Sequence, residues 1–159
     1  MAEGDRLRVR PMRAVDAPAC AGIFVAARRR ARPDVPADRF STEDFELATA
    51  GLEMIIVEHQ GLVAGFAGFD RPHRELELLF VSPEAQGRGA GALLLAESGR
   101  ILGLGAHLRC DAQNASGRAF YRAQGWVETG ESWGRIQFTR PDPMMALFPS
   151  LLGVPLFAL

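Results

Sequence analysis

Apolar stretches of two kinds recur along the chain and predict two kinds of element. The shorter stretches are rich in β-branched and aromatic residues, or alternate with polar ones, and are bounded by turn-forming residues, which is typical of strands. The second, third and fourth of these stretches are separated only by short turns, which predicts an antiparallel meander. The predicted strands are residues 7–10, 54–58, 62–69, 75–81, 107–110, 126–129 and 135–140.

Longer segments with an apolar stripe predict helices. A second helix is expected to start at 41–44, where Ser-Thr-Glu-Asp offers capping oxygens. A third should run from a glycine-rich turn to about Leu104, with Gly105 ending it, and a fourth should cover 116–123. The first helix is expected over 14–30, with an apolar stripe of Val15, Ala19, Ile23, Phe24 and Ala27.

The order of these elements is β-α-α-β-β-β-α-β-α-β-β, with antiparallel pairing first and a β-α-β crossover afterwards. This order predicts an α/β (α+β) fold with a mixed central sheet flanked by helices. At 159 residues the chain should form a single domain, residues 1–140, followed by an apolar tail at 141–159.

Composition narrows the range of partners. The net charge of −1 gives no reason to expect nucleic acid or an anionic membrane surface. No segment approaches the ~20 apolar residues that span a bilayer, and the N-terminus lacks the apolar core of a signal peptide, so a cytoplasmic location is expected. Cys20 and Cys110 match no metal-ligand spacing, which predicts buried free thiols and no bound metal.

A glycine-rich turn, which follows the strand at 75–81 after a short Pro-containing loop, carries the clearest chemical signal. Its residues are Gln86, Gly87, Arg88, Gly89, Ala90 and Gly91, and an apolar helix begins there. Backbone N–H groups in such a turn, together with the positive end of the helix dipole, form an anion site suited to phosphate.

The same turn fits a dinucleotide fingerprint, Gly87-x-Gly89-x-x-Ala92, with Asp111 as the ribose acid. That hypothesis is disfavoured because five residues, 82–86, separate the strand from the first glycine. Too little chain remains for the further β-α-β units of such a domain, and the segment 114–126 would have no role.

That segment contains Asn114 near a helix start, Ala119, Phe120 and Tyr121 inside the helix, and Gly125-Trp126 after it. Together, the two segments resemble the signatures of the GNAT N-acetyltransferase superfamily. Gln86, Gly89 and Gly91 match the fixed positions of its acetyl-CoA signature, Gln/Arg-x-x-Gly-x-Gly/Ala. The second segment is similar to Asn-x-x-Ala…Phe-Tyr-x-x-x-Gly-Phe, with Trp126 in place of the last Phe.

The resemblance implies a splayed sheet whose gap between the fourth and fifth strands receives the pantetheine of acetyl-CoA. The glycine turn would receive the pyrophosphate, and a backbone N–H on the fourth strand would stabilise the developing oxyanion. The residues that the resemblance assigns to acetyl-CoA are Leu79, Phe80, Val81, Gln86, Gly87, Arg88, Gly89, Ala90, Gly91, Ala92 and Asn114. For Asn114, helix capping alone is an equally good hypothesis, and Arg88 can instead face solvent.

Two residues are candidates for proton transfer. Tyr121 matches the position of the superfamily's thiolate-protonating Tyr, although a purely structural role is open. Glu77 interrupts an apolar strand, and alternation places it on the face of Leu79 and Val81, so it is the candidate general base. The alternative is an ion pair with an Arg such as Arg71 or Arg74. Glu75 is the reserve base.

The predicted function is transfer of an acetyl group from acetyl-CoA to a primary amine by direct attack in a ternary complex. The acceptor is a small molecule or a peptide or protein amine, and the basic run 28–32 favours an acidic one. A non-catalytic domain that senses acyl-CoA is the alternative.

The apolar tail departs from the resemblance, which ends near Arg140. Residues 144–159 contain ten large apolar side chains, and Pro149 and Pro155 prevent a long helix. The tail is expected to fold back on its own sheet or to contact a second copy in a homodimer.

Overall fold

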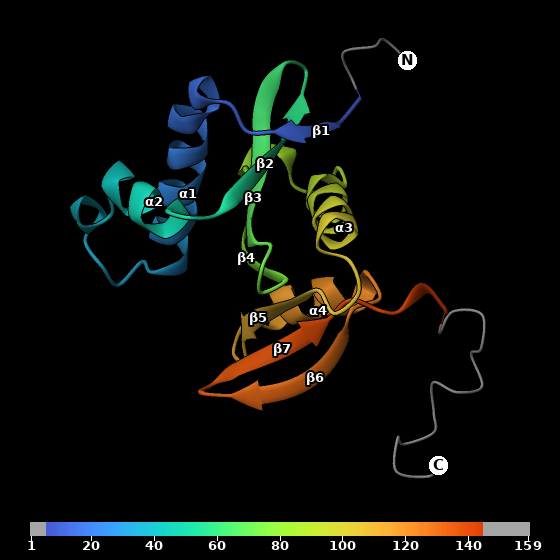
Figure 1. The fold of residues 1–159 in the computed structure, drawn as a ribbon. Helices are drawn as coiled ribbons and strands as arrows, with labels where there is room; N and C mark the ends of the chain where they lie inside the picture. Colours follow the sequence, from blue (N-terminus) through green and yellow to red (C-terminus); the bar gives the residue numbers. More distant parts are fainter. Residues whose placement is uncertain (1–5, 145–159) are drawn as a thin grey trace. The chain divides into compact units, whose positions relative to one another are not determined.

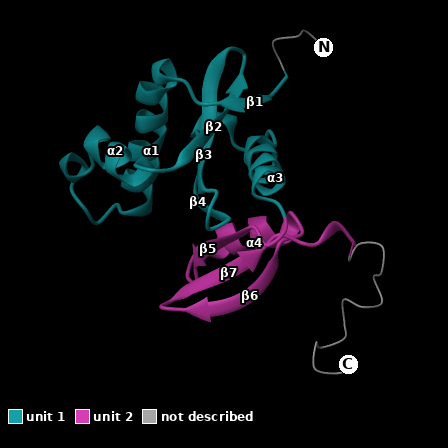
Figure 2. Ribbon diagram, viewed as in Figure 1, with its two compact units in different colours: residues 1–103 teal, residues 104–159 magenta. Residues whose placement is uncertain are grey.

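The computed structural model describes residues 6–144. The chain divides into two compact units, residues 1–103 and 104–159, coloured separately in Figure 2. The helices and strands follow one another in the order predicted from the sequence. None of the helices among the described residues is both long and apolar enough to cross a membrane.

The first unit is built on a four-stranded antiparallel sheet. Its strands are β1 (Arg8–Pro11), β2 (Glu53–His59), β3 (Leu62–Asp70) and β4 (Glu75–Val81), in that spatial order. The predicted meander of β2, β3 and β4 is confirmed. A two-residue turn joins β2 to β3, with Gln60 and Gly61 both at positive φ, as the twist of a tight hairpin requires.

Three helices cover this sheet. In Figure 1, α1 (Ala17–Ala31) and α2 (Thr42–Thr49) lie on one side of it and α3 (Ala90–Leu102) on the other. The third helix ends at Gly103, at φ 79°, two residues before the predicted stop. The described part of this unit also contains the short 3-10 turns η2 (Ala14–Asp16), η3 (Ala37–Arg39) and η4 (Pro83–Ala85).

The core beneath α1 and α2 is aromatic. Phe24 of α1 contacts Phe45 of α2 and Phe80 of β4 edge to face, with ring centroids 5.8 and 5.4 Å apart. Phe66 of β3 stacks on Phe80 at 5.3 Å. Such ring pairs add stabilisation beyond the burial of their area. The two helices are therefore attached to β3 and β4 through one cluster.

The predicted stripe of the first helix is wrong in its first turns. Val15 is 75% exposed and Ala19 is also exposed, whereas the buried residues of α1 are Cys20, Ala21, Phe24 and Val25. Residues 14–16 form a 3-10 turn instead of the start of the α-helix, which changes the helical phase of Val15 relative to α1.

A buried ion pair fixes this 3-10 turn. The Arg10 guanidinium donates to both carboxylate oxygens of Asp16, at 2.7 and 2.9 Å, and to Glu58 of β2 at 2.8 Å. The N–H of Arg13 donates to Asp16 at 2.7 Å. Arg10 thereby holds the pKa of Asp16 well below its usual range. The carboxylate of Asp16 can be buried at the entry to α1 because its charge is paired with Arg10.

In the second unit, the described residues 104–144 form a three-stranded antiparallel sheet with one helix. Its elements are β5 (His107–Asp111), α4 (Ala115–Ala123), β6 (Val127–Ser132) and β7 (Arg135–Thr139), and the strand order is β5-β7-β6. Leu108, Cys110, Ile136 and Phe138 are buried. Because the pairs Leu108–Phe138 and Cys110–Ile136 are in register, these residues share the face that α4 covers through Tyr121.

Gly65 of β3 yields a stability prediction. A Cβ at this position would lie 2.6 Å from the carbonyl oxygen of Phe80 and 3.3 Å from Leu94 Cδ1 of α3. Gly65→Ala should therefore destabilise the protein by about 1–3 kcal/mol through overpacking. Gly22→Ala is the control, because Gly22 lies in α1 with open space around a Cβ and should be neutral or stabilising. Urea unfolding midpoints measure both, and equal midpoints would contradict the prediction.

Candidate active site

The glycine turn joins η4 to α3 in the first unit, as predicted. Gly87 and Gly89 have φ values of 80° and 85°, in the left-handed region that favours glycine. Gly89 is the N-cap of α3. No heavy atom lies within 4 Å of a Cβ built at either glycine, other than those of adjacent residues. The turn therefore leaves open space that a larger residue would fill.

The backbone of this turn is rich in unused donors. Among residues 6–144, no acceptor lies in hydrogen-bond geometry with the backbone N–H groups of residues 87–92. The next one, of Leu93, donates to the carbonyl of Gly89 at 3.0 Å. Unused N–H groups at a helix N-terminus, where the helix dipole is positive, bind anions such as phosphate. Side chains contribute little, because Gln86 and Arg88 are exposed.

Strand β4 places Leu79, Phe80 and Val81 just before the turn, all half-buried. Leu79 pairs with Ala67, and Val81 with Gly65, whose Cβ position faces α3. The side chain of Phe80 belongs to the aromatic core on the opposite face. Its backbone is therefore the only part of Phe80 that a ligand on the α3 face could contact.

The structure corrects the predicted setting of Glu77. Leu76 pairs with Phe69 and Leu78 with Gly68, so Glu77 is an extra residue without a partner on β3, a β-bulge. The bulge interrupts the alternation on which the expectation that Glu77 shares a face with Leu79 and Val81 was based. Glu77 is exposed, so its carboxylate is solvated and carries no cost of burial.

The ion pair considered for Glu77 is also not formed with Arg71. The Nε of Arg71 donates instead to Glu53 at 2.7 Å. Within residues 6–144, the structure shows no hydrogen bond or ion pair of the Glu77 side chain. An exposed carboxylate at a bulge can reach a water or an incoming amine.

Asn114 caps α4, which confirms the capping role that the sequence predicted as an alternative to cofactor binding alone. Its Oδ1 accepts from the N–H of Gly117 at 3.0 Å and from the Ser116 hydroxyl at 3.2 Å. Sequence reasoning did not identify Gly117, where a Cβ would lie 2.5 Å from Asn114 Nδ2. The signal available was a glycine three residues after an N-cap Asn. Capping uses Oδ1 and leaves Nδ2 for other contacts.

Tyr121 is held by its ring and not by its hydroxyl. The ring contacts Phe120 at 5.2 Å and Phe138 at 5.4 Å between centroids. The hydroxyl has no hydrogen-bond partner among the described residues. Burial, with a smaller contribution from Cys110, raises the pKa of Tyr121 to about 12. Tyr121 is therefore a protonated phenol at neutral pH, available as a donor.

Both cysteines are buried and free, as predicted. Burial raises the pKa of the Cys20 thiol to about 11 and also raises the pKa of Cys110. Only the thiolate is a strong nucleophile. Neither cysteine is therefore suited to carry an acyl group.

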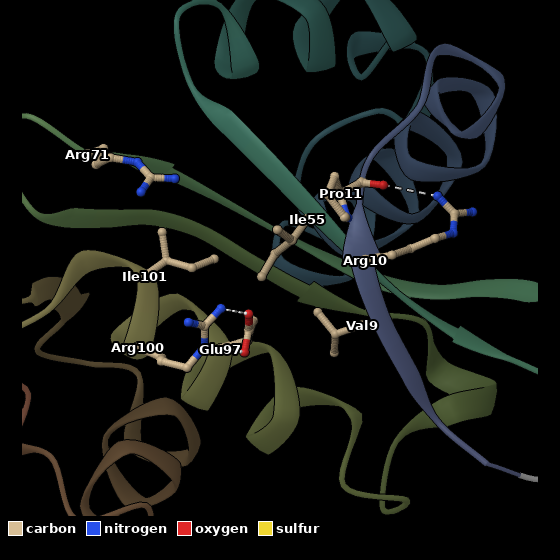
Figure 3. A pocket seen from close by; sticks show the side chains of 8 residues that line it. All are labelled: Val9, Arg10, Pro11, Ile55, Arg71, Glu97, Arg100 and Ile101. Atoms are coloured by element: carbon tan, nitrogen blue, oxygen red, sulfur yellow. Dashed lines mark hydrogen bonds and ion pairs between the residues drawn. The ribbon is translucent and has the colours of Figure 1, made fainter.

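A pocket of about 480 Å³ lies elsewhere in the first unit, between β1 and α3 (Figure 3). Its arginines already have carboxylate partners: Arg100 binds Glu97, Arg71 binds Glu53, and Arg10 binds Asp16 and Glu58. It contains none of the residues predicted for the site. Its lining residues are Val9, Arg10, Pro11, Ile55, Arg71, Glu97, Arg100 and Ile101.

Comparison with known families decides the classification. A sequence model described as the acetyltransferase (GNAT) domain matches residues 34–137, well over half of the chain. The chain belongs to the GNAT acetyltransferase family. The matched segment contains Glu77, the glycine turn, Asn114 and Tyr121. No curated protein matched the sequence.

Solved structures resemble this GNAT protein over most of its length. PaiA N-acetyltransferase from Thermoplasma acidophilum, in complex with coenzyme A, has a TM-score of 0.71 at 15% identity, covering 86% of this chain and 99% of its own. A GCN5-related N-acetyltransferase from Rhodopseudomonas palustris has a TM-score of 0.65 at 22% identity, covering 85% and 95%. Ribosomal-protein-alanine N-acetyltransferase from Brucella melitensis has a TM-score of 0.60 at 21% identity, covering 84% and 98%.

At these identities the likeness shows the fold, and the GNAT-like α/β fold class predicted from the sequence is confirmed. Family membership, together with a relative solved with coenzyme A, supports an acyltransferase that uses acyl-CoA. Membership of this family therefore favours acyl-CoA over a dinucleotide as the ligand of the turn that contains Gly87 and Gly89.

The setting of Tyr121 predicts an unusual alkaline titration. The chain has one tyrosine, so tyrosinate absorbance reports Tyr121 alone. We expect the midpoint of the tyrosinate titration at pH about 12 in the folded protein and at pH about 10 in denaturant. Because the fold favours the neutral phenol, this contribution to stability is complete below about pH 10 and is lost between about pH 10 and 12. Circular dichroism at each pH checks the fold, and a folded-state midpoint near 10 would contradict the prediction.

Proposed function

We propose that this GNAT protein transfers an acetyl group from acetyl-CoA to a primary amine, by direct attack in a ternary complex. The observation that carries the proposal is the run of unused backbone N–H groups at residues 87–92, at the start of a thirteen-residue helix. A pyrophosphate is the part of acetyl-CoA that such a site would hold. Acetyl-CoA supplies the activated thioester.

The turn is fitted to its ligand by the lack of side chains. Gly87 and Gly89 leave the backbone accessible, and the side chain of Ala90 is buried in the first unit, away from solvent. The pyrophosphate would therefore meet N–H groups and not methyl groups. In β4, the backbone of residues 79–81 is the proposed contact for the acetyl end, including the N–H that stabilises negative charge on the thioester oxygen.

Tyr121 is the proposed general acid. Its hydroxyl is not engaged by the described residues, and its pKa of about 12 keeps it protonated across the physiological range. A proton held there is available to the leaving thiolate. The packing of the ring on Phe138 supports a fixed position for the hydroxyl.

Glu77 is the proposed general base, acting directly or through water. Its exposure and its position at a bulge support access to a bound amine, because bulges change the aim of side chains near active sites. Asn114 is proposed to contact the cofactor through Nδ2 while Oδ1 caps α4. The acceptor is a small-molecule amine or a peptide or protein amine. The preference for an acidic acceptor and the cytoplasmic location stay predictions.

Binding of acetyl-CoA should depend on Gly89. Gly89→Val introduces a branched side chain into the open space of the turn and should reduce affinity, measured by calorimetry, at least about 100-fold. Gly103→Val is the matched control: Gly103 ends the same helix, at a similar φ of 79° and with similar open space. Its ψ of −158° lies outside the left-handed region of Gly89, so a Val there is strained at least as much, and it does not touch the turn. Equal affinities in the two variants would contradict the site, and a preference for NAD over acetyl-CoA would support the dinucleotide hypothesis.

Catalysis should depend on Tyr121 and Glu77 but acetyl-CoA binding should not. Tyr121→Phe removes the proton donor and keeps the ring, so kcat should fall by about 10²–10⁴-fold. Glu77→Gln should lower the rate mainly at low pH, where the amine most needs a base. Release of free CoA across a panel of amines measures both.

Near-normal rates in both variants with a true acceptor would show that these assignments are wrong. Tight binding of acetyl-CoA without turnover for any amine would favour the sensor hypothesis. Phe120→Leu is a control for packing around Tyr121, because Phe120 contacts its ring and carries no proton.

A further inference from the structure

The pocket between β1 and α3 combines an apolar wall with a charged rim. In Figure 3, Arg71 lies on one side of the hollow, and the ion pair of Arg100 with Glu97 lies on another. All of the lining residues belong to the first unit, and none of them belongs to the glycine turn. The pocket is therefore a separate feature of that unit. The apolar residues of its wall are Val9, Pro11, Ile55 and Ile101.

The arginines of the pocket differ in how many N–H groups they have left. Each nitrogen of the Arg10 guanidinium already donates, to Asp16, Glu58 or a backbone carbonyl. Arg71 is engaged through Nε alone, which donates to Glu53 at 2.7 Å. No acceptor among residues 6–144 takes a hydrogen bond from its Nη1 or Nη2. The outer edge of the Arg71 guanidinium therefore keeps a pair of parallel N–H groups for a ligand.

Arg100 has one nitrogen left. Its Nε and Nη2 donate to the two carboxylate oxygens of Glu97, and its Nη1 has no acceptor within the described part of the chain. The side chains of Arg71 and Arg100 are 55% and 69% exposed. Exposed ion pairs contribute little to stability, so the rim can adjust to a ligand at small cost.

These groups determine the charge of a suitable ligand. Two parallel N–H groups of a guanidinium match the two oxygens of a carboxylate. Glu53 and Glu97 lie beside the arginines, and their negative charges oppose a ligand with more than one negative charge, such as a phosphate ester. A single carboxylate is therefore favoured.

The apolar wall determines the rest of the ligand. Ile55 is buried, whereas Val9 and Ile101 are half-buried. An apolar chain lying against these side chains removes apolar surface from water, which is favourable. The volume of about 480 Å³ is within the range of sites for small molecules.

We propose that this pocket binds a small monocarboxylate with a short apolar chain. The carboxylate accepts from the paired N–H groups of Arg71, and the chain packs on Val9, Ile55 and Ile101. The pocket shares no residue with the proposed acetyl-CoA site, so the two ligands bind at the same time. This inference does not depend on the proposed function.

Calorimetry with sodium hexanoate tests the proposal. We expect one site per chain, with a dissociation constant on the order of 1 mM for a ligand of this size. Arg71→Gln removes the paired N–H groups and should weaken binding about tenfold or more. Arg30→Gln is the matched control, because Arg30 is an exposed arginine of α1, on the other side of the sheet from α3, and it should leave the constant unchanged.

Circular dichroism checks that both variants keep the fold. No saturation of the full chain at about 10 mM hexanoate, a concentration about tenfold above the expected constant, would overturn the proposal. Equal effects of the two substitutions would overturn it as well.

A series of probes separates the two parts of the ligand. Acetate keeps the carboxylate without the longer chain and should bind about tenfold more weakly or worse. Hexylamine keeps the chain but reverses the charge, and hexyl phosphate adds a second negative charge, so both should bind more weakly than hexanoate. Acetate binding as tightly as hexanoate, or tighter binding of hexylamine or hexyl phosphate, would overturn the assigned ligand class.

Methyl NMR locates the bound hexanoate. The methyl signals of Ile55 and Ile101 should shift, whereas that of Ile136, in β7 of the second unit, should not. Saturating CoA should not displace hexanoate. Shifts confined to other isoleucines, or competition with CoA, would overturn the proposal. Loss of acetyl transfer with hexanoate binding intact would count against the proposed function only.

Discussion

The close approach of β3, β4 and α3 at Gly65 is the constraint on which the candidate site depends. With no side chain there, the backbone of β3 lies against the carbonyl of Phe80, and Leu94 of α3 packs over the same point. Leu94, Leu95 and Leu102 bury the helix on this face. The N-terminal amides of α3 are consequently fixed relative to the end of β4, and an anion bound by them has a defined place beside that strand. Packing in the core thus fixes the position of the candidate anion site.

Features that depend on local chemistry were predictable from the sequence. The glycine turn, the span of β4 and the start of α4 follow from glycine conformations, apolar runs and capping, and the structure confirms all three. The bulge at Glu77 was not predictable, because a bulge exists only relative to the register of a partner strand. The burial of Asp16 was also missed, since its charge is balanced by Arg10, which itself reaches Glu58 in a strand 48 positions away. The sequence was enough to name candidate residues, but their burial and their contacts could be described only from the folded structure.

The second unit shows how one residue can serve both packing and chemistry. The ring of Tyr121 completes the apolar face formed by Phe138 and its neighbours, and this burial is also what raises the pKa of the phenol. Asn114 is similar, because Oδ1 accepts the capping hydrogen bonds and the amide nitrogen of the same side chain is not needed for them. For such residues, a structural role and a functional role are not competing hypotheses.

The position of β1 has a consequence for the order in which the first unit assembles. The β2–β3 and β3–β4 hairpins join neighbours in sequence, whereas β1 pairs with β2 only after the chain has passed through both α1 and α2. Closing that long loop carries an entropic cost that the hairpins do not have, and non-local contacts of this kind slow folding. The ion pair of Arg10 with Glu58 forms only when β1 pairs with β2, so we expect it to form late and the folding nucleus to lie in the meander of β2, β3 and β4.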